Sequence, residues 1–277
     1  MDIKSLKIQA FETRKAILQM IYTARAGHTG GSLSAADLMT ALFFKILQLD
    51  PRNPKWEGRD YFVLSKGHCV EAYWAVLAHR GFFPKDELAT FSQFGSRLIG
   101  HPNNEVPGVE VNTGALGHGL SISVGMAIGL KKRKMTNRVF TLLGDGELGE
   151  GSVWEGAMAG GHYELDNLIA IIDRNHLQIS GSTEDVMTLE PLAEKWKSFG
   201  WSVKEIDGNS MEEIVNVLTS VPFERDKPSL IIAHTIKGKG VDEMENLAKW
   251  HHGVPDSELF ERAMNRLETM KQGVLNG

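Results

Sequence analysis

The sequence predicts an α/β fold: a parallel sheet of about five or six strands with helices on both faces. Short apolar runs rich in β-branched residues recur along the chain, and a helix-length segment or a long connection follows each of them. Such alternation is typical of parallel sheets, whose strands are buried on both faces. The predicted strands are residues 60–65, 139–143, 168–172, 201–206 and 229–233.

The helices are predicted from apolar residues that recur every three to four positions. The glycine-rich segment 27–34 separates the first two helices and is predicted to be a turn. Ser34 and Ser210 are each followed three residues later by an acid, which predicts that they are N-caps. The predicted helices are residues 3–24, 35–47, 70–79, 120–132, 189–199, 211–218 and 256–270.

Composition excludes several classes of function. The chain has 277 residues, of which 42% are hydrophobic and 23% charged, as in water-soluble globular proteins. Its net charge of −5 argues against binding to nucleic acid or to an anionic membrane surface. No segment approaches the ~20 apolar residues of a membrane span. Cys69 is the only cysteine, which excludes an internal disulfide and predicts a cytoplasmic protein with one buried thiol.

One stretch between two predicted strands carries a possible nucleotide motif. Gly144–Gly149 reads GDGELG, which matches the dinucleotide fingerprint GxGxxG, and Asp173 ends the next strand where a ribose-binding acid is expected. A pyrophosphate on this turn would face the carboxylates of Asp145, Glu147 and Glu150, which is costly unless a cation intervenes. A NAD-binding oxidoreductase is therefore the weaker interpretation.

A metal-bound diphosphate fits the same stretch better. Asp145 and Asn175 each follow a strand, and the carboxyl ends of parallel strands meet at one edge of the sheet. Carboxylate and amide oxygens are ligands of Mg²⁺ or Ca²⁺, and such an ion would link them to a diphosphate. The sequence therefore predicts a metal-diphosphate site at this edge.

Histidines stand on several separate loops, at His28, His68, His101 and the pair His251 and His252. Zinc sites built from histidine usually contain a short-spaced pair on one helix, which these loops lack. The ordinary pKa of imidazole lies near neutrality, so these side chains suit proton transfer to and from hydroxyl groups.

These segments together resemble a known family. GDG followed by Asn175 resembles the thiamine diphosphate motif, and the surrounding residues look like the N-terminal half of a transketolase. The matching segments are GHTGG (27–31), SKGH (65–68), IGHP (99–102), NTGALGHG (112–119), HTIKGKG (234–240) and WHHG (250–253).

The resemblance implies a role for each matching residue. Asp145, Asn175 and the carbonyl of Leu177 would hold the metal, and the backbone of Gly146 would meet the diphosphate. The other cofactor and substrate contacts that it implies are the backbone groups of Gly114 and Leu116 at the aminopyrimidine and the imidazoles of His28, His68, His101 and His252. His251 is the alternative to His252 as the histidine that faces the diphosphate, and no role is implied for His118.

The resemblance also implies a reaction and a partner. Transketolases transfer a two-carbon ketol unit from a ketose phosphate to an aldose, with an essential glutamate on a second, pyrimidine-binding domain. We expect residues 1–277 to be one thiamine diphosphate-binding domain, with 254–277 a helical tail, and a C-terminal transketolase subunit to supply the second domain. A heterotetramer with two copies of each subunit is predicted, with Glu150 and Glu155 as interface candidates.

Other functions remain open at this level. Halves of a deoxyxylulose phosphate synthase or of a 2-oxo-acid dehydrogenase would use the same cofactor. A non-catalytic regulatory subunit would also lack the pyrimidine-binding domain.

Overall fold

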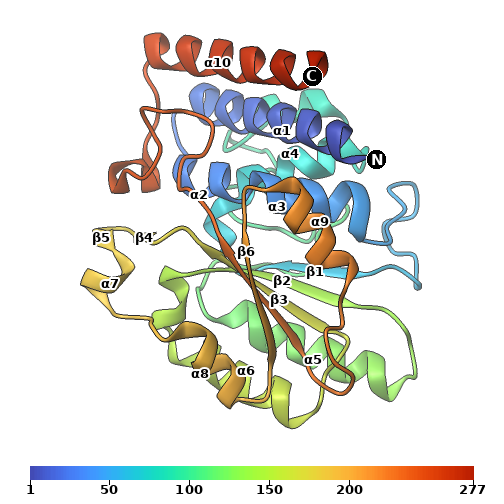
Figure 1. Cartoon of the computed structure of the whole chain (residues 1–277). Coiled ribbons are helices and arrows are strands. Elements are labelled where there is room, and N and C mark those ends of the chain that lie inside the picture. The colour runs from blue at the N-terminus through green and yellow to red at the C-terminus, as the bar shows by residue number, and fades with distance from the viewer.

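The computed structural model describes residues 1–277 and has a five-stranded sheet at its centre, in the order β1-β2-β3-β7-β6 (Figure 1). All neighbouring strands are parallel. The sheet confirms the predicted fold class. The strands are β1 (Tyr61–Leu64), β2 (Val139–Gly144), β3 (Leu168–Arg174), β6 (Ser202–Asp207) and β7 (Ser229–His234).

Alternating side chains of the strands build a separate core on each face of the sheet. On β2, Phe140 and Leu142 belong to one core, whereas Val139 and Leu143 belong to the other. This is the period of two that a strand buried on both faces requires. The first core includes residues of α1 (Ile3–Ala24), α3 (Ala36–Ala41), α4 (Val70–Arg80) and α9 (Met211–Thr219), and the second includes residues of α5 (His118–Lys132), α6 (Gly151–His162) and α8 (Leu192–Ser198).

The first and last helices lie side by side above the first core (Figure 1). α10 (Ser257–Asn276) buries Ala263 and Leu267 and is tied to α1 by ion pairs. The pairs Lys15–Glu268 and Lys271–Glu12 each have an N–O distance of 2.8 Å. None of the helices combines the length and the apolar character that crossing a bilayer requires.

The segment 27–34 differs from its prediction, because most of it is helical. α2 (Thr29–Ser34) is fully buried, and α3 and a π-helical turn, η1 (Leu42–Ile46), follow it. A Cβ on Gly30 would lie 2.9 Å from the carbonyl oxygen of Trp250, and one on Gly31 would lie 2.5 Å from Cys69 Sγ. The two glycines are thus needed for close packing and not for a turn.

The two predicted caps also differ. The side chain of Ser34 is not an N-cap, because its hydroxyl donates to Asp173 Oδ2 (2.6 Å). The cap prediction for Ser210 is confirmed, since its hydroxyl accepts from the backbone of Glu213 at the start of α9.

Short elements after the strands form the edge of interest. They are the 3-10 turns η2 (Gly67–Cys69), η4 (Gly146–Gly149) and η5 (Ala248–His252), the two-stranded β4 (Leu177–Gln178) and β5 (Gly181–Ser182), and α7 (Thr183–Val186); a further 3-10 turn, η3 (Lys85–Thr90), follows α4.

Candidate active site

A cavity of about 290 Å³ lies where β1, β2, β3 and β7 end. This is the edge at which open parallel sheets bind ligands. The side chains and backbone around it come from segments far apart in the sequence. The lining residues are His28, Gly31, Lys66, His68, Gly114, Leu116, Gly144, Asp145, Gly146, Glu147, Asn175, Leu177, Gln178, Ile179, Lys237 and His251.

One side of the cavity, which we call the carboxylate side, is formed by Asp145 and Asn175, the residues that follow β2 and β3. Asp145 is buried, with Oδ1 accepting from the backbone of Gly146 (2.8 Å) and Oδ2 from that of His176 (2.6 Å). Burial and then the nearby Asp173 raise the pKa of Asp145, and the guanidinium of Arg174 counteracts both. Asn175 is also buried, and its Oδ1 accepts from the backbone of Leu177 (3.2 Å).

Asp173 does not face the cavity as a ribose-binding residue would. It is fully buried and pairs with the Lys66 ammonium (2.5 Å), while the hydroxyls of Ser34 and Thr235 donate to it. Burial raises the pKa of Asp173, but Lys66 and the hydroxyls of Ser34 and Thr235 together outweigh burial and lower it. The acid that a NAD-binding site would need is therefore occupied by internal partners.

Four imidazoles gather on the opposite side of the cavity. The His28 ring lies 5.0 Å from that of His68, 5.5 Å from that of His251 and 4.6 Å from that of His252, measured between centroids. Buried Glu71 fixes the loop of His28, because its carboxylate accepts from the His28 backbone N–H (2.9 Å). The structure thus brings together three of the predicted histidines and His251.

The pKa values of three of these histidines are strongly depressed. Burial, followed by the rings of His252 and His251, lowers the pKa of His28 to about 3. Burial and then Lys66 lower that of His68 to about 2, and burial and then Lys237 lower that of His251 to about 4. At neutral pH these rings are uncharged, so each can accept one hydrogen bond and donate another.

Two buried lysines complete this basic side. Burial lowers the pKa of Lys66, but Asp173, together with Cys69 and Asp145, outweighs burial and raises it. Lys237 has no carboxylate partner. Its Nζ donates to the carbonyl of Leu177 (3.1 Å) and to His251 Nδ1 (3.2 Å), which leaves the ring proton of His251 on Nε2. Burial and then the charge of Lys66 lower the pKa of Lys237.

The remaining predicted residues lie around the cavity in different ways. His252 is exposed and packs against His28 without lining the cavity. A Cβ on Gly114 would lie 3.2 Å from the ring of His101, so His101 adjoins the lining. His118 is exposed at the start of α5, where its Nδ1 is 3.1 Å from the carbonyl oxygen of Leu116.

Gly146 allows a close approach between two lining segments. A Cβ on this residue would lie 2.8 Å from Cβ of Gln178 in β4, closer than such atoms come in proteins. The small residue therefore keeps η4 and β4 in contact while its backbone remains at the cavity.

Both sides of the cavity fit a metal-bound diphosphate. Asp145, Asn175 and the carbonyl of Leu177 are hard oxygen donors of the kind that Mg²⁺ and Ca²⁺ bind. Ammonium and imidazole N–H groups, as at Lys237 and His251, form charge-assisted hydrogen bonds to phosphate oxygens.

The sequence-based prediction did not include several lining residues. Lys66 lies in the segment just after β1, and Lys237 lies in the loop just after β7, so their position at the carboxyl edge of the sheet was a usable signal. Buried Glu147 accepts from Ser65 and from the backbone of Gly117, which holds the loops together. Cys69 is buried, which confirms the prediction of a buried thiol, and burial raises the pKa of this thiol to about 11.

Comparisons with known proteins return one family. The family model of the transketolase thiamine diphosphate-binding domain matches residues 7–266. One subunit of the apulose-4-phosphate transketolase of Phocaeicola vulgatus is 52% identical over 267 residues, which are 96% of this chain and 95% of the relative. A 6-deoxy-6-sulfo-D-fructose transketolase subunit of a Clostridium species is 41% identical over 264 residues, 95% of this chain and 96% of that protein.

Longer relatives match over part of their length. The crystal structure of transketolase from Campylobacter jejuni has a TM-score of 0.91 at 32% identity, and the match covers 97% of this chain and 43% of that one. Human transketolase is 38% identical over 250 residues, 90% of this chain and 40% of the human protein. The chain thus spans about two fifths of these transketolases.

Proposed function

Because this chain belongs to the transketolase family, we propose that it is the diphosphate-binding subunit of a two-subunit transketolase. The observation that carries the proposal is the cavity. It opposes hard oxygen donors, at Asp145 and Asn175, with neutral imidazoles and the ammonium of Lys237 across one sheet edge. A thiamine diphosphate needs both kinds of group, because its diphosphate is held through a divalent cation and by hydrogen-bond donors.

In this proposal Asp145, Asn175 and the carbonyl of Leu177 hold Mg²⁺ or Ca²⁺. The backbone of Gly146 contacts the diphosphate, and the backbones of Gly114 and Leu116 contact the aminopyrimidine. All of these residues line the cavity, which supports these assignments.

The histidines orient the sugar and move protons. His28, His68 and His101 are assigned to the hydroxyl groups of the substrate. Neutral rings at His28 and His68 suit the orientation of these hydroxyls, since each can accept a hydrogen bond at one nitrogen and donate one from the other. The proton on Nε2 of His251 makes this residue the better diphosphate contact, and His252 supports His28 by packing.

Thiamine diphosphate, when bound, supplies the electron sink that allows the bond next to a ketose carbonyl to break. This chain's residues hold the cofactor and the sugar. A C-terminal transketolase subunit with a pyrimidine-binding domain provides the remaining acid, in a heterotetramer with two copies of each subunit. Glu150 and Glu155 are exposed at the start and on the outer face of α6, where they can contact that partner.

The proposed reaction is the transfer of a two-carbon ketol unit from a ketose phosphate to an aldose. Two relatives carry the names of an apulose-4-phosphate and a 6-deoxy-6-sulfo-D-fructose transketolase, so donors with an anionic terminal group are the first to test.

We further propose that residues 1–277 act as one thiamine diphosphate-binding domain, with 254–277 as a helical tail. The single five-stranded sheet supports this unit. The cytoplasm is the proposed compartment, in keeping with one buried, unpaired cysteine.

The proposal is tested by mixing the chain with a C-terminal transketolase subunit, thiamine diphosphate and Mg²⁺. Ketol transfer from a panel of ketose phosphates and from 6-deoxy-6-sulfo-D-fructose is then measured by product analysis. We expect activity from the mixture and none from either protein alone. Calorimetric titration should show thiamine diphosphate binding that requires Mg²⁺ and no binding of NAD. Absence of both binding and transfer would overturn the proposal.

A further inference from the structure

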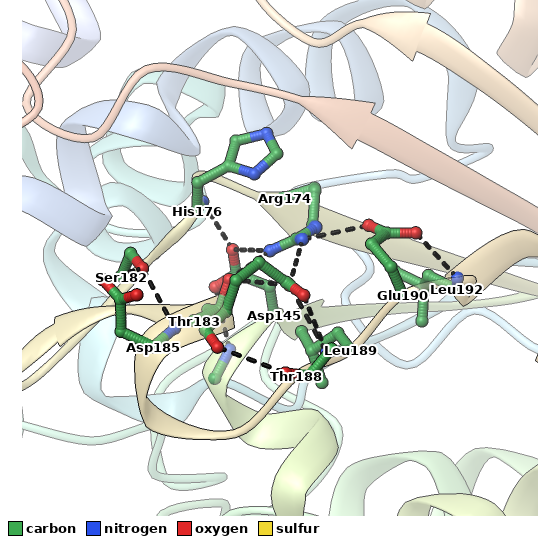
Figure 2. Close-up of polar contacts among 12 residues, drawn as sticks. Asp145, Arg174, His176, Ser182, Thr183, Asp185, Thr188, Leu189, Glu190 and Leu192 are labelled. Atoms are coloured by element: carbon green, nitrogen blue, oxygen red, sulfur yellow. Dashed lines mark hydrogen bonds and ion pairs between the residues drawn. The ribbon is translucent and has the colours of Figure 1, made fainter.

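Arg174 is the last residue of β3 and precedes the proposed metal ligand Asn175. Its side chain is 1% exposed, and its guanidinium does not line the cavity. Figure 2 shows this guanidinium at the centre of a polar network that includes Asp145. No motif of the sequence pointed to this residue.

One nitrogen of Arg174 contacts the proposed metal ligand on β2. Nη1 donates to Asp145 Oδ2 (3.3 Å), the oxygen that also accepts from the backbone of His176 (2.6 Å) (Figure 2). Oδ1 is set by the backbone of Gly146. Three donors thus fix the plane and the rotation of this carboxylate.

The same guanidinium contacts the middle and the C-terminal end of a surface segment, residues 177–190, which we call the flap. Nη1 also donates to the hydroxyl of Thr183 (2.5 Å), while Nη2 donates to Glu184 (2.8 Å) and Glu190 (3.0 Å) (Figure 2). The backbone of Leu189 donates to Glu184 as well, so the end of the flap is folded over the guanidinium.

The flap also carries part of the cavity. The carbonyl of Leu177 is the third proposed metal ligand, and Gln178 and Ile179 line the cavity beside it. Asp145 on β2 and the flap are therefore two separate elements of the proposed metal site, and Arg174 is bonded to both.

From these contacts we infer that Arg174 is a positioning residue that couples the position of the flap to binding of the metal-diphosphate. The inference rests on the proposed function, since it takes Asp145 and Leu177 as metal ligands. One guanidinium orients the carboxylate and anchors the flap, so binding at one element stabilises the other.

A purely structural role explains the network less well. A buried arginine loses its hydration, and an apolar pair of similar volume in place of a whole buried ion pair often leaves a fold equally stable. The Nε of Arg174 is also buried without a hydrogen-bond partner, which costs about 1–3 kcal/mol. The contacts with Asp145, Glu184 and Glu190 instead indicate that Arg174 serves to position these groups and not to stabilise the fold.

The test uses the variants Arg174→Lys and Arg174→Met in the full chain. Partners of metal ligands typically change metal affinity by 10- to 100-fold when they are removed. We therefore expect the Mg²⁺ concentration that half-saturates thiamine diphosphate binding to rise about 10- to 100-fold in both variants, with saturating Mg²⁺ restoring binding. If only charge mattered, Arg174→Met would bind Mg²⁺ more tightly and Arg174→Lys would resemble the wild type.

Hydrogen exchange of the flap supplies the second readout. Mg²⁺ with thiamine diphosphate should slow exchange of residues 177–190 in the wild type, and this protection should be lost in Arg174→Met. The matched control is Arg138→Met, which removes a partly buried arginine from buried Asp60 at the opposite edge of the sheet. That variant should retain the flap protection and the Mg²⁺ midpoint, whatever its stability.

The Mg²⁺ titrations and the hydrogen-exchange measurements together distinguish two results. If the wild type binds but Arg174→Met and Arg174→Lys match Arg138→Met in midpoint and protection, the inference is wrong and the proposed function stands. If the wild type does not bind thiamine diphosphate with Mg²⁺, the proposed metal site fails and the coupling fails with it.

Discussion

The two sides of the cavity differ in how completely their polar groups are paired. On the carboxylate side, Asp145 accepts three hydrogen bonds and Asp173 is paired with Lys66. On the basic side, Lys237 faces a carbonyl and an imidazole, and His28 packs mainly against other rings. The carboxylate side is thus preorganised by the protein, whereas the basic side is held by packing and is suited to an anion. Four changes test this contrast.

Asp145→Asn should have the largest effect on the carboxylate side. The amide loses the charge and presents an N–H to groups that already donate to this position. We expect thiamine diphosphate affinity in Mg²⁺ to fall by about 100-fold or more, because changes to the partners of a ligand alone reach that range. Calorimetry measures it, with Asp60→Asn as the matched buried control. If both variants bound thiamine diphosphate with equal affinity, Asp145 would not be a ligand of the metal.

Lys237→Met should separate binding from stability on the basic side. A hydrogen bond to a charged group contributes about 1.5–3 kcal/mol, so diphosphate affinity should fall by about 10- to 100-fold. The ligand-free protein should become more stable, because burial lowers the pKa of Lys237. The destabilisation that comes from burying the charged Lys237 is fully present at a pH below the folded-state pKa of this lysine. It vanishes at a pH above about 10.5, the pKa of lysine in the unfolded chain.

Urea unfolding and calorimetry check both effects of Lys237→Met. Lys239→Met is the control on the same loop, since Lys239 pairs with Glu245 and does not line the cavity. If Lys237→Met lost stability and kept its affinity for thiamine diphosphate, the basic side would not be the anion-binding side of the cavity.

The pH dependence of stability reports the packed imidazoles. The pKa of His68 is about 2 when folded and about 6.5 when unfolded. Between these values the unfolded chain binds more protons, so stability falls as the pH is lowered below 6.5. The slope from this residue is at most about 1.4 kcal/mol per pH unit. His68→Gln should reduce the slope of unfolding free energy against pH by up to that amount. Urea unfolding at about pH 7, 6 and 5 measures this slope. The control His162→Gln, at an exposed position, should follow the wild type.

His251→Asn and His252→Asn should show the smallest difference. Loss of one hydrogen bond to an anion from His251 should weaken thiamine diphosphate binding by about tenfold, since a hydrogen bond to a charged group contributes at least about 1.5 kcal/mol. His252→Asn should stay within about twofold, because its ring packs on His28 outside the cavity lining. The opposite order would restore His252 as the diphosphate contact.

The sequence was sufficient for the sheet and for the edge where the site lies. Apolar runs such as 139–143 and 168–172 predicted the strands, and the parallel arrangement then placed Asp145 and Asn175 together. The rule works because both residues follow strands whose register is determined by burial on two faces.

Features that depend on tertiary contacts were not predictable in this way. Gly30 and Gly31 have the local signature of a turn, but their role is to let α2 approach Trp250 and Cys69. Similarly, the choice between His251 and His252 depends on the rotation of one 3-10 turn, η5, against Lys237. Adjacent histidines carry no sequence signal for that rotation.

The close approach of Gly146 to Gln178 has an evolutionary consequence. Because a Cβ at position 146 would clash with Cβ of residue 178, substitutions at 146 are tolerated only when residue 178 becomes glycine or the flap shifts. Positions 146 and 178 should therefore covary among related chains, even though they are distant in sequence. Such covariation would mark lineages in which the flap has been remodelled.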